Sequence, residues 1–222
     1  MARRLTIKAQ SSRLKGERER SKKGLVIVIT GIAGIGKTSF GQQLSEKLDN
    51  SVIIDKDTIN DAFLRKSSFW KPFPDAYCVS VKPLSRKTAF YLENVRFQTY
   101  HCMLKIAQDN LQAGKIPILD GNYHKEISNG YLRGFLIPFF ENLNSQVKFI
   151  LCHADEATMR ERIENRNAER DSEKLISDKQ WKSFLAENPS VPEEMASFDH
   201  IKVDLGKPLQ RQFSAVLSFL GN

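Results

Sequence analysis

Short apolar runs alternate with longer amphipathic stretches along most of the chain. The first run, Gly24–Thr30, is apolar almost throughout, which is typical of a parallel strand buried on both faces. Similar runs predict strands at 51–55, 115–120, 146–152 and 199–204. The stretches between the runs predict helices. The chain is therefore expected to form a three-layer α/β domain, with a five-stranded parallel sheet covered by helices on both faces.

The helices are bounded by recognisable start and stop signals. A long one is expected from an N-cap at Ser85 to about Ala113, where Gly114 would end it. Pro208 is expected to open a last helix that runs to Leu220. The remaining helices are expected from the first glycine-rich turn to about Leu48 and over 57–66, 126–143, 155–167 and 178–186. Residues 67–84 carry three prolines and several aromatics and read as a long loop.

A glycine-rich sequence follows the first strand and matches the phosphate-loop pattern G-x-x-x-x-G-K-[ST] without deviation. Glycines let successive backbone N–H groups converge on a phosphate, and the N-terminus of the following helix adds partial positive charge. Lys37 is expected to reach the β- and γ-phosphates, and the Thr38 hydroxyl to ligate Mg²⁺. The expected nucleotide-binding residues are Gly31, Ile32, Ala33, Gly34, Ile35, Gly36, Lys37, Thr38 and Ser39.

Carboxylates end the second and third predicted strands. Asp55 and Asp57 come at the carboxyl end of the second, where ligands bind in open α/β sheets. Asp57 can act as the base that accepts a hydroxyl proton, and it is also suited to be the N-cap of the next helix. Asp120 ends the third strand as a Walker-B aspartate would, which predicts a second Mg²⁺ ligand. Asn122, Tyr123 and His124 follow it; they are expected at the mouth of the site, either contacting substrate or forming a surface loop.

Four arginines crowd the helix after the fourth strand. Arg162, Arg166 and Arg170 are spaced four residues apart and share one face, whereas Arg160 precedes them. Like charges on one face repel unless an anion lies against them, and a triphosphate in transfer is such an anion. The alternative is a solvated helix whose glutamates offset the arginines. Arg162 and Arg166 are the stronger candidates for catalysis, and Arg170 for nucleotide binding.

Charge is distributed unevenly in this basic chain of 222 residues. The formal net charge is +8, but residues 1–24 hold nine basic and two acidic side chains, so the other residues net only +1. We therefore divide the chain into a basic tail, 1–24, expected to be disordered, and a single domain, 25–222. The tail leaves nucleic-acid binding and targeting open as alternatives.

Several classes are disfavoured. The three cysteines form no CxxC pair and read as reduced thiols, which indicates a cytoplasmic protein. The longest apolar run is far shorter than the roughly 20 residues of a membrane span. A GTPase would need an N-K-x-D guanine motif, which the sequence lacks.

With these residues in place, the chain resembles the P-loop kinases grouped around polynucleotide kinase, zeta toxin and chloramphenicol phosphotransferase, an AAA-type kinase domain. The resemblance covers about residues 25–190 and rests on 31–39, 54–58, 118–120 and the R-x-x-x-R of Arg162 and Arg166. It implies that Asp57 is the base toward an acceptor hydroxyl. It also implies that the arginines belong to a lid, about 160–178, that closes over ATP.

The sequence departs from polynucleotide kinases at the acceptor side. Where they carry an arginine three residues after the base, this chain has Asn60, although Arg65 could substitute. The leading hypothesis is thus an ATP- and Mg²⁺-dependent kinase that phosphorylates a hydroxyl of a small molecule. A polynucleotide 5′-hydroxyl kinase tethered by the basic tail and a non-catalytic, toxin-like ATP-binding protein are the alternatives. The oligomeric state is left open.

Overall fold

Five parallel strands form the predicted sheet. They are β1 (Gly24–Thr30), β2 (Ser51–Asp55), β3 (Ile116–Asp120), β4 (Ser145–His153) and β5 (His200–Asp204), in the spatial order β2-β3-β1-β4-β5. The structure, a computed structural model, describes residues 23–64, 86, 88–166 and 175–221. Because β1 lies at the centre of the sheet, the loop that leaves it opens at the middle of the ligand-binding edge.

Strand register brings the predicted carboxylates to that same edge. Asp55 on β2 pairs in register with Asp120 on β3, and Asp120 pairs with Ile29 on β1. Three neighbouring strands therefore end at one level, and the segments that follow them lie side by side.

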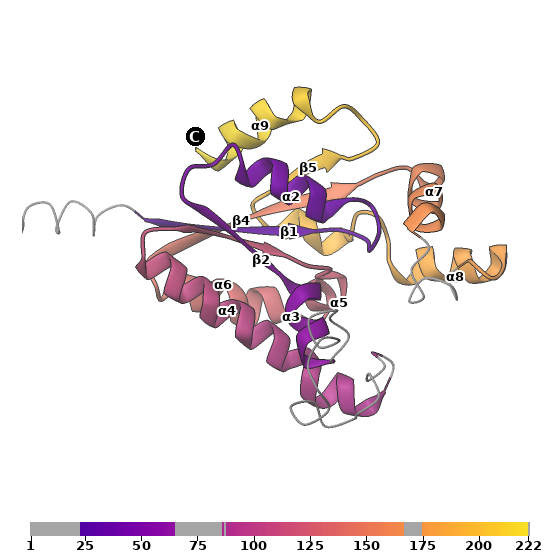
Figure 1. The fold of residues 1–222 in the computed structure, drawn as a ribbon, viewed down its shortest axis with the longest axis horizontal. Helices are drawn as coiled ribbons and strands as arrows, with labels where there is room; N and C mark the ends of the chain where they lie inside the picture. Colours follow the sequence, from indigo (N-terminus) through magenta and orange to yellow (C-terminus); the bar gives the residue numbers. More distant parts are fainter. Residues whose placement is uncertain (1–22, 65–85, 87, 167–174, 222) are drawn as a thin grey trace, which may run out of the picture.

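Helices cover both faces, as expected (Figure 1). On one face lie α2 (Lys37–Ser45) and α9 (Gln210–Leu220); on the other lie α4 (Arg96–Gln112) and α6 (Ile137–Glu141). Four further helices gather toward the carboxyl ends of the strands: α3 (Lys56–Phe63), α5 (His124–Ser128), α7 (Glu156–Arg166) and α8 (Asp178–Glu187).

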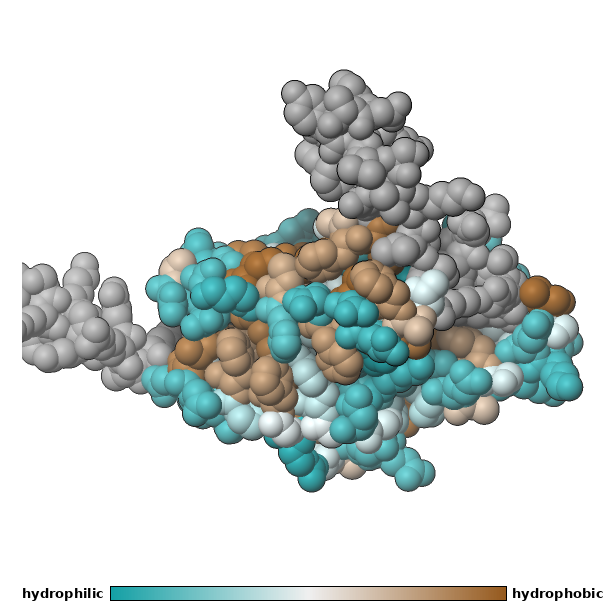
Figure 2. Space-filling model, turned by 90° about the horizontal axis from the view of Figure 1, so that it is seen from below, coloured by the Kyte–Doolittle hydropathy of each residue, from teal (hydrophilic) through white to brown (hydrophobic). Residues whose placement is uncertain are grey.

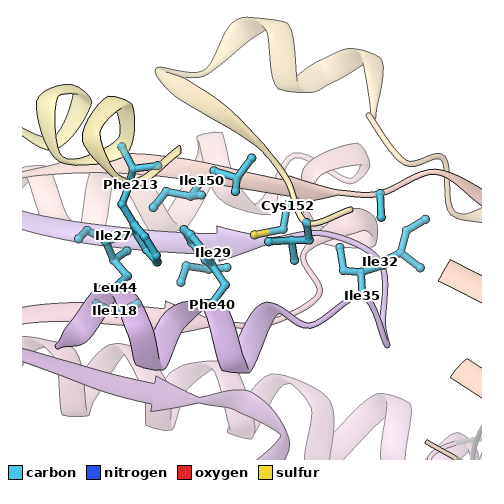
Figure 3. Close-up of a cluster of buried hydrophobic side chains, with 14 of the residues drawn as sticks. Ile27, Ile29, Ile32, Ile35, Phe40, Leu44, Ile118, Ile150, Cys152 and Phe213 are labelled. Carbon is cyan, nitrogen blue, oxygen red and sulfur yellow. The ribbon is translucent and has the colours of Figure 1, made fainter. Parts of the chain in front are cut away.

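The alternating side chains of β1 divide the core in two. Ile27 and Ile29 pack under α2 and α9, where Phe40 and Phe213 stack with ring centroids 5.5 Å apart (Figure 3). Val26 and Val28 point the other way, into a second cluster with α4 and α6. Burial on both faces explains why the sequence of β1 is apolar almost throughout rather than alternating.

Two predicted helices differ from those observed. The expected helix over 126–143 is wrong: it is divided into α5, a π-helical segment η3 (Leu132–Leu136) and α6. Gly130 lies between α5 and η3 with φ of 79°, a left-handed conformation that interrupts a helix. The long helix is confirmed up to its stop at Gly114, but it includes a π-helical segment, η2 (Tyr91–Val95), before α4. Its N-cap, Ser85, lies outside the described residues.

The remaining bounds agree with expectation to within a few residues. The largest of these differences are at the ends of α2 and α3, which stop at Ser45 and at Phe63; α3 also begins one residue early, at Lys56. A short 3₁₀ helix, η5 (Glu193–Ser197), lies before β5 and was not predicted.

Large apolar side chains are exposed on the face that carries α4 and η3 (Figure 2). They include Phe97, Ile106 and Phe135. Among the described helices, none is both long and apolar enough to cross a membrane.

Candidate active site

The loop between β1 and α2 has the backbone conformation of a phosphate loop. Gly31, Gly34 and Gly36 have φ of 144°, 95° and 100°, values that side-chain-bearing residues rarely adopt. Gly31 is also confined by space, because a Cβ there would lie 2.3 Å from the carbonyl oxygen of Cys152. Ile32 and Ile35 anchor the loop by burying their side chains in the core. Ala33 is half-buried, and Ser39 is exposed in the first turn of α2.

Helix α7 packs directly against this loop. A Cβ on Gly34 would lie 2.6 Å from Ile163 and 3.4 Å from Nη2 of Arg166. Arg162 donates from Nη1 to the carbonyl of Ile35 (2.6 Å) and from Nη2 to the carbonyl of Leu205 (2.8 Å). The structure thus brings both predicted arginines to the phosphate loop. Arg162 additionally braces the loop against the turn after β5, a role that the sequence did not indicate.

This packing predicts that Gly34→Ala destabilises the loop more than backbone strain alone would. Gly130→Ala is the matched control, since Gly130 also has positive φ but has open space around it. We expect the control to lower the free energy of unfolding by about 1 kcal/mol. Overpacking against Ile163 should cost Gly34→Ala roughly 1–3 kcal/mol more, with weaker nucleotide binding. Denaturant unfolding and ATP titration measure both effects, and equal losses in the two variants would contradict this interpretation.

Lys37 lies within the loop at the start of α2, and its Nζ donates to the carbonyl of Ile32 at 2.9 Å. Burial lowers the pKa of Lys37, while the nearby Asp120 acts in the opposite direction. A partly buried ammonium favours an anionic partner, because a neighbouring negative charge offsets the cost of desolvation.

The hydroxyl of Thr38 donates to Oδ2 of Asp120 at 2.7 Å. Asp120 is only 2% exposed, and burial raises its pKa against the effects of Lys37 and Thr38. A hydroxyl and a carboxylate are oxygen ligands of the kind that Mg²⁺ takes from proteins, so these two residues fit the ion and would hold it. Among the described residues there is no cluster of three or more His, Cys, Asp or Glu that could hold a metal ion.

The end of β2 differs from expectation in one respect. Asp55, not Asp57, is the N-cap of α3: its side chain accepts from the backbone N–H of Asp57 at 2.9 Å and from the hydroxyl of Thr58 at 2.7 Å. The helix starts one residue earlier than expected, so Asp57 lies in its first turn. The expected N-cap role of Asp57 is therefore wrong, and the Asp57 carboxylate instead forms an ion pair with Arg86.

Arg86 is the residue that sequence reasoning missed. Its Nη1 contacts Oδ1 of Asp57 at 2.9 Å, and its Nη2 contacts Oδ1 of Asp61 at 2.7 Å. No motif surrounds Arg86, and it lies 29 residues from Asp57. Only the packing of α4 beside α3 brings the two together.

The residues after β3 do not all reach the mouth of the site. Tyr123 is fully buried in the core against Tyr100, so its expected place at the mouth is wrong. An apolar environment accounts for this position, and burial raises its pKa well above the usual value. Asn122 is half-buried and binds His124, whose ring also contacts the carbonyl of Pro189 at 2.8 Å. His124 therefore ties α5 to the segment after α8.

The other predicted residues are placed as follows. Arg160 turns to the surface and pairs with Glu164 (3.1 Å) and Asp178 (2.9 Å), as in the solvated alternative. Outside the described residues lie Arg65, Arg170, the stretch 167–174 of the expected lid, and nearly all of the basic tail.

The sheet order and the loop together give the fold of a P-loop NTPase. A family model described as an AAA domain matches residues 26–189, and the chain belongs to this family. No curated protein matches the sequence.

Solved kinase structures share the fold at low sequence identity. A sugar kinase from Janibacter sp. HTCC2649 is 14% identical over 90% of this chain and 95% of its own, with a TM-score of 0.53. A gluconokinase from Sinorhizobium meliloti is 18% identical, covering 90% and 92%, with a TM-score of 0.52. A shikimate kinase from Bacteroides thetaiotaomicron is 16% identical, covering 89% and 99%, with a TM-score of 0.54. The three structures span nearly the same length as the described domain.

Proposed function

We propose that this protein is an ATP- and Mg²⁺-dependent kinase that transfers the γ-phosphoryl group to a hydroxyl of a small molecule. The observation that carries the proposal is the juxtaposition at one sheet edge of Lys37, the Thr38–Asp120 pair and Asp57. The phosphate loop follows β1 and Asp57 follows β2, with β3 and its Asp120 between them, so a carboxylate that can take a proton lies near the proposed triphosphate site. The kinases of similar fold are named for small acceptors, which favours such an acceptor here.

Each residue has a role in the transfer. The backbone N–H groups of the phosphate loop and the ammonium of Lys37 bind the phosphates, and Arg166 and Arg162 border the same loop. Asp57 accepts the proton as the acceptor's O–H bond breaks. The acceptor oxygen forms its bond to the γ-phosphorus while the bond to the β-phosphate oxygen breaks, and ADP leaves.

Thr38 and Asp120 would hold Mg²⁺, which when bound would neutralise charge on the phosphates. Burial raises the pKa of Asp120, and only its ionised carboxylate can serve as a metal ligand. Metal-dependent nucleotide binding should therefore weaken as the pH falls toward the pKa of Asp120.

The Thr38 hydroxyl is expected to set the metal affinity. Thr38→Val keeps the shape but removes the oxygen, and we expect the Mg²⁺ concentration for half-maximal transfer to rise by about tenfold or more, the loss of one charge-assisted ligand contact. Thr38→Ser keeps the oxygen and is the control. A magnesium titration of transfer compares the two, and identical curves for Thr38→Val and wild type would contradict the assignment.

Membership of the group around polynucleotide kinase, zeta toxin and chloramphenicol phosphotransferase, and a lid over 160–178, remain parts of this proposal. The close approach of α7 to the phosphate loop supports the lid, since both arginines already border the nucleotide site.

The decisive experiment is an acceptor screen with ATP labelled at the γ-phosphate. It spans sugars, nucleosides, oligonucleotides and aminoglycoside- or phenicol-type compounds. We expect transfer to a small polyhydroxyl compound. Transfer to oligonucleotides alone would favour the polynucleotide kinase, and ATP binding without transfer to any acceptor would favour a non-catalytic protein.

A further inference from the structure

Arg86 makes directed contacts with one face of α3. Besides its ion pairs with Asp57 and Asp61, its Nε lies 2.9 Å from the amide of Asn60. These three residues occupy positions i, i+3 and i+4 of the helix, so their side chains point the same way. One guanidinium therefore spans three side chains of a single helix face.

The orientation of the Asn60 amide follows from counting hydrogens. The single hydrogen of the Thr99 hydroxyl goes to the carbonyl of Val95 at 3.0 Å. Asn60 must then donate its amide hydrogen to Thr99, at 3.1 Å, and turn its oxygen toward Nε of Arg86 and the hydroxyl of Tyr91. In this arrangement the Thr99 hydroxyl, the Asn60 amide, Nε of Arg86 and the Tyr91 hydroxyl each donate to an acceptor.

The amide that contacts Arg86 is itself fixed. Asn60 is 1% exposed and Thr99 is fully buried, and both belong to the contact between α3 and α4. Arg86 is thus held in place by a buried polar network and not merely by surface charges, which gives its contact with Asp57 a defined geometry.

Charged side chains of both signs surround Asp57. Anionic Asp55, Asp61 and Asp120 face it from β2, α3 and β3, and cationic Lys37, Lys56 and Arg86 face it from α2, α3 and the segment before α4. Burial lowers the pKa of Lys37 and brings that of Lys56 to about 8, so neither amine is a fixed charge under all conditions. The guanidinium stays charged throughout the working pH range.

We propose that Arg86 is a positioning residue for Asp57, which keeps the carboxylate ionised and oriented to accept the proton of the acceptor hydroxyl. This inference rests on the proposed function, since it assumes that Asp57 is the base. It adds to the site a residue from outside the phosphate loop and strand ends. Without Arg86, neighbouring carboxylates would favour the protonated form of Asp57, which cannot act as a base.

A titration of Asp57 tests the proposal without any acceptor. Carbon-13 NMR of aspartate-labelled protein follows the carboxylate, with Asp57→Asn identifying the signal. Arg86→Gln is expected to raise the titration midpoint of Asp57 by at least about one pH unit, the effect of losing a cation in contact. Arg86→Lys should raise it less, because lysine keeps the charge but not the forked geometry. Asp61→Asn, which removes the second partner of Arg86 and one anion, should not raise it.

Kinetics with the acceptor found in the screen provide a second readout. Arg86→Gln should lower kcat at neutral pH and move the acid limb of the pH profile to higher pH, because the ionised form of Asp57 is the active one. ATP affinity should change by no more than a few-fold. Arg86→Lys should recover part of kcat.

The outcomes separate the two proposals. An unchanged Asp57 midpoint in folded Arg86→Gln, in a wild-type protein that transfers phosphate, would overturn the role of Arg86 alone. A wild type that transfers to no acceptor would overturn the kinase, whatever the titration gives. If Arg86→Gln does not fold, Arg86→Lys replaces it, and an unchanged midpoint and pH profile in that variant would overturn the inference.

Discussion

Asp57→Asn is expected to reduce phosphoryl transfer by about 10²–10⁴-fold, the range that a positioned general base contributes. Asparagine keeps the size of the side chain and can still accept a hydrogen bond from Arg86, but it cannot take a proton at neutral pH. ATP affinity should stay within a few-fold of wild type, because Asp57 belongs to α3 and not to the phosphate loop. Single-turnover transfer and equilibrium ATP titration give the two quantities separately.

Asp61→Asn is the matched control for this prediction. Asp61 lies one turn further along α3 and binds the same arginine, at 2.7 Å. It should retain transfer to within a few-fold if the loss in Asp57→Asn reflects proton acceptance. Equal losses in both variants would show that the carboxylates serve only to hold Arg86, and a fully active Asp57→Asn would remove Asp57 as the base.

Lys37→Met is expected to weaken both ATP binding and transfer, with a loss in kcat of about 10²–10³-fold, as for removal of one charged donor from a developing transition state. Methionine keeps the apolar stem that the site buries but removes the ammonium. The carbonyl of Ile32 also loses the donor that it accepts from at 2.9 Å. The effect therefore differs from that of Asp57→Asn, in which binding is preserved.

Lys105→Met controls for the loss of a lysine charge, since Lys105 is exposed on α4 and pairs there with Gln108 and Asp109 of the same helix. It should bind and transfer as wild type does. Thermal unfolding of both variants shows whether the fold survives. Unaltered ATP affinity in Lys37→Met would exclude this loop as the triphosphate site.

The elements of the fold were largely predictable because each depends on a local pattern. Strand β1 is apolar almost throughout because both of its faces are buried. The phosphate loop after it is recognisable in the sequence because its backbone has positive φ at three positions, and each of them is glycine. The prediction failed where a local pattern had two solutions. Residues 126–143 were expected to form one helix, yet Gly130 adopts a left-handed conformation that divides it.

Roles that depend on burial were harder to predict. Tyr123 follows a strand end where polar residues meet ligands, and its sequence position gives no sign that the ring fills a gap beside Tyr100. Similarly, either Asp55 or Asp57 could cap α3, and the choice depends on the residue at which the helix starts.

The sequence by itself determined that this chain forms a parallel α/β domain with a phosphate loop, since strand periodicity and glycine spacing are properties of contiguous residues. Only the tertiary structure decided the strand order and the contacts that join distant residues: Thr38 with Asp120, 82 residues apart, Arg162 with Ile35, 127 apart, and Arg86 with Asp57. Such contacts result from how the strands pair and how α3, α4 and α7 pack. That packing depends on all parts of the core together. For this reason no local sequence motif indicates that Arg86 contacts Asp57.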